Sequence, residues 1–134
     1  LNATSQWIKK RSDKMGISGS GSTAVVLAFD ERDPTKAMIL HAGDSRAYRF
    51  RRGRVHQFSR DHSVVAELVA QGEITPEEAH THESLGVITH YAGMDEHAKP
   101  HVRSFALKPG DRITETESAV DVIDLVSKYV FGGV

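Results

Sequence analysis

Two short polar runs hold the residues whose types and spacing could carry chemistry. The first, Gly43-Asp44-Ser45-Arg46, separates two apolar stretches, so Asp44 is expected at a sharp turn where two strands end. A carboxylate held there can bind a hard divalent cation. The alternative is that Asp44 and Ser45 only satisfy backbone groups of the turn, or that Asp44 pairs with Arg46. Spacing alone favours this structural interpretation.

The second run, Asp61-His62-Ser63, contains the residue types of a hydrolase triad. Sequence neighbours point in different directions on helices and strands, so these three side chains cannot form one triad together. Apolar residues at helical spacing begin directly after Ser63, which favours Asp61 or Ser63 as a helix cap. No catalytic side chain is predicted from this run.

Eight histidines raise the question of a zinc site. His80 and His82 are two positions apart, a spacing that converges only on a strand. His97 and His101 are four apart, but Pro100 interrupts any helix that would align them. The chain has no cysteine, which excludes thiolate nucleophiles, cysteine zinc sites and disulfides. We therefore expect no zinc site.

Charge is concentrated in residues 46–60, which hold six arginines and no acid. The whole chain carries −1, so the remainder carries −7. This basic strip could bind phosphate groups through bidentate guanidinium contacts, or it could be an exposed hairpin in water, and composition slightly favours the second. The low net charge and the lack of interleaved stacking aromatic residues beyond Tyr48 and Phe50 argue against nucleic-acid binding.

The elements that must position these residues are strands followed by helices. Apolar and β-branched runs predict strands over 23–29, 37–42, 46–50 and 55–58, joined as an antiparallel meander. A tight turn at Arg52-Gly53 would place Arg51 opposite Arg54 and Arg49 opposite His56. A further hairpin is expected from strands over 102–107 and 112–113 around Pro109-Gly110.

Helices are predicted over 1–14, over 63–71 with Gly72 after its end, and from a capping box at Thr75 and Glu78. A second capping box at Thr114 and Glu117 precedes an amphipathic stretch over 119–130. Together the elements indicate an α+β fold with antiparallel sheets.

Length and composition indicate one globular domain over residues 1–134. The longest apolar run is far below the roughly 18 residues that span a bilayer, so no membrane association is expected. The absence of cysteine fits a cytoplasmic protein.

Six segments along the chain carry a further signal. They are Gly21–Ala24 (GSTA), His41–Tyr48 (HAGDSRAY), Phe58–Ser63 (FSRDHS), Gln71–Ala79 (QGEITPEEA), Gly86–Thr89 (GVIT) and Leu107–Ile113 (LKPGDRI). In content and in order they resemble the metal-dependent serine/threonine protein phosphatases of the 2C type (the PPM family), and most of all its bacterial members.

The resemblance implies a four-layer α-β-β-α sandwich of antiparallel sheets, of which this chain supplies a part. It implies hydrolysis of phosphoserine and phosphothreonine in proteins by a water activated by Mn²⁺ or Mg²⁺. The implied partners are a phosphorylated protein substrate and, as a further option, a cognate serine/threonine kinase, with neither nucleic acid nor membrane. Asp44 matches a family position near an accessory metal ion, and is the one metal residue we assign.

The aspartates that hold the family's central metal pair have no counterparts at the matching places. We therefore expect segments of a longer enzyme to be missing before Gly21, between Ile113 and Thr114, and after Val134, and expect these 134 residues alone to be inactive. The alternative is a non-catalytic, phosphatase-like interaction module.

Overall fold

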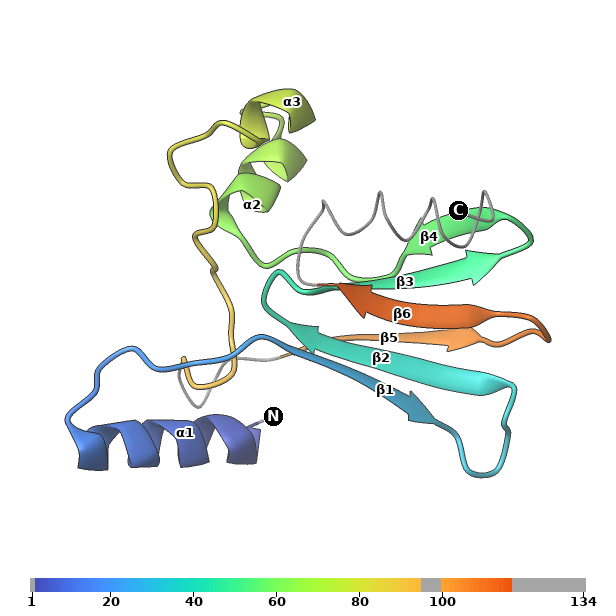
Figure 1. Cartoon of the computed structure of the whole chain (residues 1–134), viewed down its shortest axis with the longest axis horizontal. Helices are drawn as coiled ribbons and strands as arrows, with labels where there is room; N and C mark the ends of the chain where they lie inside the picture. Colours follow the sequence, from blue (N-terminus) through green and yellow to red (C-terminus); the bar gives the residue numbers. More distant parts are fainter. Residues whose placement is uncertain (1, 95–99, 117–134) are drawn as a thin grey trace, which may run out of the picture. The chain divides into compact units, whose positions relative to one another are not determined.

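The computed structural model describes residues 2–94 and 100–116 (Figure 1). Its elements are α1 (Asn2–Met15), β1 (Ala24–Phe29), β2 (Lys36–Ala42), β3 (Arg46–Arg51), β4 (Arg54–Gln57), α2 (Val64–Gln71), α3 (Pro76–Ala79), β5 (His101–Ala106) and β6 (Arg112–Thr116). They divide into two compact units. The first takes Leu1–Ala24, Ala42–Asp44 and Asp61–Pro100, and the second takes Val25–His41, Ser45–Arg60 and His101–Val134.

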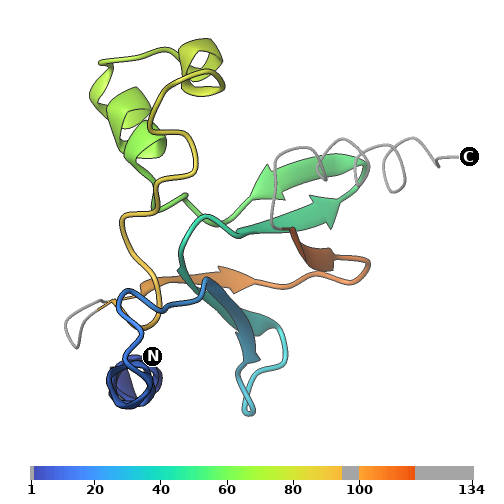
Figure 2. The ribbon, with the colours of Figure 1, turned by 60° about the vertical axis from the view of Figure 1, so that its left-hand side comes forward.

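The second unit contains two three-stranded sheets, in the orders β1-β2-β5 and β4-β3-β6 (Figures 1 and 2). β2 pairs with β5, and β3 pairs with β4 and β6, all antiparallel. The core is drawn from both sheets, so the sheets pack face to face. Its members are Val25, Leu27, Ile39, Ala47, Phe58, Phe105 and Ile113. The predicted α+β class with antiparallel sheets is confirmed.

The predicted four-strand meander is wrong, because β2 and β3 lie in different sheets. Ile39 in β2 and Ala47 in β3 are each 1% exposed and belong to the same core. Two neighbouring strands of one sheet could not bury them against each other face to face, whereas strands in opposed sheets do. The turn at Gly43-Asp44-Ser45 therefore carries the chain from one sheet to the other.

The predicted hairpin of the last two strands is also wrong. The turn at Pro109-Gly110 forms, but β5 pairs with β2 while β6 pairs with β3. β6 continues through Thr114, which lies opposite Tyr48, so Thr114 does not cap a helix. Pairing with β3 and the β-branched residues of this segment outweigh the local capping signal. The amphipathic stretch over 119–130 lies outside the described residues.

Local signals predicted the β3–β4 hairpin and its register correctly. Arg52 and Gly53 both have positive φ, at 49° and 74°, as a two-residue turn requires. Arg49 lies opposite His56, and Arg51 lies opposite Arg54.

The predicted helices of the first unit are confirmed too. Thr75 and Glu78 form both bonds of a capping box at α3, and Gly72 ends α2 in the left-handed conformation. No helix in the part of the chain that the structure describes is long and apolar enough to cross a membrane.

Replacing Ser63 with alanine is expected to lower the free energy of unfolding by about 1 kcal/mol. Ser63 is the N-cap of α2, and its Oγ accepts a hydrogen bond from the Ala66 N–H at 3.3 Å. Urea unfolding followed by circular dichroism measures the change. Ser63→Thr, which retains the hydroxyl acceptor without adding a charge at this buried position, serves as the control, and equal losses in both variants would contradict the capping role.

Candidate functional site

The Gly43 turn of the first unit requires glycine. Its φ is +102°, and a Cβ built there would lie 2.4 Å from Thr23 Cγ2 and 3.2 Å from Thr23 Cα. Real Cβ atoms essentially never lie as close as 2.4 Å to another heavy atom, and side chains are strained at this φ. The absence of a side chain at position 43 thus lets the turn pack directly against Thr23.

Two hydrogen bonds join Gly43 to His62. The Gly43 N–H donates to His62 Nδ1 at 3.2 Å, and the His62 N–H donates to the Gly43 carbonyl at 3.0 Å. Nδ1 must therefore be unprotonated, and the neutral ring carries its proton on Nε2. His62 therefore acts as a structural acceptor that fixes the turn.

His62 also contacts a fourth segment of the chain, at residues 89–90. Its carbonyl accepts from the Thr89 N–H at 2.8 Å, and its ring lies 5.1 Å from the ring of His90. Thr89 in turn donates from Oγ1 to Glu67 on α2 at 2.8 Å. We call Thr23, Gly43, His62 and Thr89 the Gly43 junction, because they join four segments that are far apart in the sequence.

Asp44 follows the Gly43 junction, and its side chain is half-buried. Within residues 2–94 and 100–116, its carboxylate has no hydrogen bond and no ion pair. The side chain of Asp44 therefore makes neither of the contacts that the structural interpretation assigns to it, and Asp44 as a metal residue stays a prediction.

A metal centre needs more donors than Asp44 provides. The described residues contain no group of three or more His, Cys, Asp or Glu side chains that could hold a metal ion. Divalent cations such as Mg²⁺ and Mn²⁺ take about six ligands, mostly oxygen, and a two-metal site needs several carboxylates. The donor set of these residues therefore does not fit a two-metal centre.

The arginine strip of residues 46–60 is not uniformly exposed, which corrects the solvated-hairpin interpretation for Arg49 and Arg51. Arg51 donates from Nε and Nη2 to the two carboxylate oxygens of Asp111 at 2.6 and 2.5 Å. The Asp111 side chain is 3% exposed, and these bonds lower its pKa to about 2. Arg51 thereby ties β3 to the turn before β6. Sequence spacing gave no signal for this pair.

His41 is a second position whose role sequence reasoning missed. It is 1% exposed, and its Nε2 lies 2.7 Å from the Arg60 carbonyl. Its ring also contacts that of His101 edge-on at 5.2 Å. His41 is thus a buried residue with a polar partner in the second unit. His97 lies outside the described residues.

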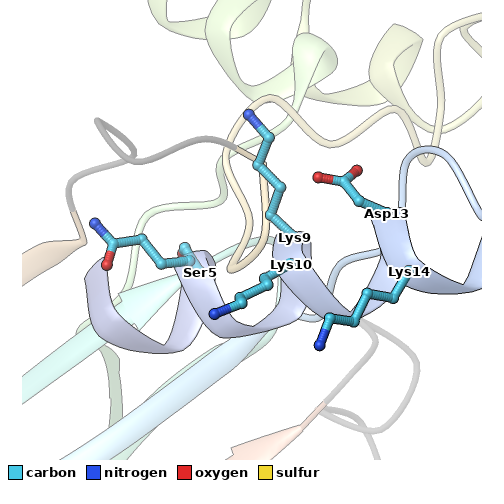
Figure 3. Close-up of a pocket in the computed structure, with 6 residues that line it drawn as sticks. Ser5, Lys9, Lys10, Asp13 and Lys14 are labelled. Atoms are coloured by element: carbon cyan, nitrogen blue, oxygen red, sulfur yellow. The ribbon is translucent and has the colours of Figure 1, made fainter.

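A hollow of about 450 Å³ runs along α1 in the first unit (Figure 3). Its lining has three lysines, one acid and two neutral polar residues, and consists of Ser5, Gln6, Lys9, Lys10, Asp13 and Lys14. Ser5 is buried and accepts a hydrogen bond from the Gly93 N–H at 3.0 Å, so it fixes the helix to the loop at Gly93. The lysines extend from an exposed helix face on flexible stems, so the hollow presents no preformed set of ligands.

Comparison with known proteins gives a consistent family. The family model described as Protein phosphatase 2C matches residues 1–68. Protein phosphatase PhpP of Streptococcus pneumoniae is 34% identical over 137 residues, which cover 97% of this chain and 54% of that protein.

Solved structures that resemble this chain indicate the same family. The serine/threonine phosphatase of S. agalactiae has a TM-score of 0.78 at 25% identity, over 98% of this chain and 62% of that one. The catalytic domain of the serine/threonine protein phosphatase PstP, in complex with two manganese ions, has a TM-score of 0.70 at 29% identity, over 84% and 45%.

The match to these curated relatives covers nearly the whole of this chain. The chain itself spans only about half of their length. The family match covers half of its residues, and the Gly43 junction gathers segments that resemble the same family. The chain belongs to the protein phosphatase 2C family.

Proposed function

We propose that the protein hydrolyses phosphoserine and phosphothreonine in other proteins, as part of a longer enzyme. One observation carries the proposal: the Gly43 junction brings four family-like segments together, and among the described residues the Asp44 carboxylate beside it has no hydrogen bond and no ion pair. A free carboxylate at the end of a strand, held by a turn that tolerates only glycine, is a position suited to a divalent cation. The names and structures of the relatives support the same activity.

Mn²⁺ or Mg²⁺ is the proposed cofactor, and the relative PstP was solved with two manganese ions. Since the described residues do not fit a two-metal centre, the remaining carboxylates would come from outside them. The predicted omissions before Gly21, between Ile113 and Thr114, and after Val134 stay predictions that would account for those carboxylates.

The proposed substrate is a phosphorylated protein, and a cognate serine/threonine kinase that phosphorylates it is a further proposed partner. A cytoplasmic location stays a prediction from the absence of cysteine.

The 134-residue chain alone is expected to release no phosphate from an aryl phosphate above the enzyme-free rate, with or without Mn²⁺. A 2C-type phosphatase that carries its full set of metal aspartates serves as the positive control. Steady phosphate release by the 134-residue chain would contradict the prediction that these residues do not form a complete metal centre.

The intact mass of the natural protein is the companion measurement, and a mass clearly above 14.7 kDa is expected. A mass of 14.7 kDa, together with binding of a phosphopeptide without hydrolysis, would instead identify a non-catalytic interaction module.

A further inference from the structure

Cationic side chains gather around Phe58 in the second unit. The Phe58 side chain is buried, and the guanidinium carbon of Arg49 lies 5.1 Å from the centre of its ring. The guanidinium carbon of Arg103 lies 5.4 Å from the same centre. His56 meets the ring edge-on, with 5.4 Å between centroids. We call Arg49, His56, Phe58 and Arg103 the Phe58 cluster.

The Phe58 cluster carries positive charge that the described residues do not neutralise. Neither Arg49 nor Arg103 forms an ion pair within the described ranges. Asp111 is bonded to Arg51 and acts on Arg49 only through space. The Nε of Arg49 is buried and has no hydrogen-bond partner there. An unsatisfied guanidinium N–H is unfavourable, and the buried Nε–H is out of reach of a ligand. Charge-assisted hydrogen bonds from the Nη groups of the same guanidinium to an anion would offset part of that cost.

The ring holds the two guanidinium groups in place before any ligand binds. Cation–π contacts fix each planar fork against Phe58, and the Arg103 Nη1 also lies 3.5 Å from the Phe58 carbonyl. Phe105 stacks on Phe58 at 4.3 Å with an angle of 32°, which covers one face of the ring. Arginine forks that are already ordered lose little entropy when they bind an oxyanion.

We propose that the Phe58 cluster binds a phosphate group. A tetrahedral dianion accepts hydrogen bonds from guanidinium forks in bidentate geometry and supplies the missing negative charge. The phosphate can be inorganic phosphate or the phosphorylated side chain of a protein, which have the same chemistry. This site contains no carboxylate and does not depend on a metal ion, so it stands apart from the proposed hydrolysis.

The test is a titration of the 134-residue chain with sodium phosphate, followed by calorimetry at constant ionic strength with EDTA present. Saturable binding is expected, and Arg49→Gln and Arg103→Gln should each weaken it roughly tenfold. Arg54→Gln removes the same charge from an exposed position of the same hairpin and should change the affinity less than about threefold. Equal losses of phosphate affinity in all three variants would show that binding depends only on the total positive charge, and this would overturn the proposed site.

A substitute variant and a second probe complete the experiment. If Arg49→Gln does not fold, Arg49→Lys replaces it, because lysine keeps the charge without the fork, and it should still weaken binding. A phosphoserine peptide that binds at least tenfold tighter than phosphate, through Arg49 and Arg103, would identify a phosphoprotein as the ligand, and equal affinities would identify free phosphate. No saturable binding of either probe would refute the proposal. The EDTA makes this outcome independent of hydrolysis.

Discussion

Replacing Gly43 with alanine is expected to lower the free energy of unfolding by about 3 kcal/mol. The new methyl group would lie 2.4 Å from Thr23 Cγ2, and the residue would have to adopt a φ of +102°. Overpacking in a tight site costs about 1–3 kcal/mol, and left-handed backbone in a non-glycine residue costs about 1 kcal/mol more. The hydrogen bonds to His62 would be strained as well. Urea unfolding measures the loss.

Gly86→Ala is the matched control, because Gly86 also belongs to the first unit and has a φ of +83° with no atom within 4 Å of a built Cβ. It isolates the backbone cost and should lose only about 1 kcal/mol. Adding Thr23→Ser to Gly43→Ala removes the nearest clashing methyl group and should restore part of the stability. Equal losses at Gly43 and Gly86, with no restoration, would mean that the contact with Thr23 does not constrain the turn.

Replacing Asp111 with asparagine is expected to cost about 2 kcal/mol near neutral pH. Asp111 accepts hydrogen bonds from Arg51 Nε and Nη2 and from the Lys108 N–H, and a neutral amide cannot reproduce this set. Bonds to charged groups are worth about 1.5–3 kcal/mol, and the partial exposure of Arg51 reduces the ion-pair contribution through screening. Thermal unfolding at pH 7 measures the change.

The pH dependence of this loss has a defined direction. The bonds from Arg51 lower the pKa of Asp111 from 3.8 to about 2, so the folded state favours the ionised carboxylate. The stabilisation is therefore full above pH 4 and disappears as the pH falls towards 2. The difference between wild type and Asp111→Asn should shrink over this interval.

Asp33, whose pKa is also lowered to about 2 by Thr35 and Lys36, titrates over the same interval, so Asp33→Asn is the required control. A difference for Asp111→Asn that stays constant from pH 5 to pH 2 would contradict the ion-pair account.

Much of the fold could be predicted because its signals are local. The N-cap at Ser63, the capping box at Thr75 and the Arg52-Gly53 turn each depend on residues within a few positions, and all three are confirmed. The sheet partners of β3 and β6 depend on which side chains share a core across long stretches of sequence. Local patterns carry no such information, so the meander, the last hairpin and the role of Thr114 were predicted wrongly.

In the candidate site, too, the local features could be predicted from the sequence and the long-range contacts could not. Its segments could be recognised in order along the chain, and Asp44 was singled out from the residues of its turn. The bonds that assemble them, such as those of Gly43 with His62, join positions 19 residues apart, and sequence spacing carries no signal for bonds over that separation. The basic strip was visible in composition, but the ion pair of Arg51 with the buried Asp111 and the stacking of Arg49 on Phe58 depend on how the strands pair, which composition does not show.

The most direct test of the proposed function is phosphate release from a phosphothreonine peptide by the natural, full-length protein. After treatment with EDTA and dialysis, we expect no release, and we expect Mn²⁺ or Mg²⁺ to restore steady turnover. Turnover that persists unchanged after the metal is removed would contradict the proposed metal-dependent hydrolysis. A full-length protein that binds Mn²⁺ but never releases phosphate from phosphoserine or phosphothreonine peptides would contradict the proposed function itself.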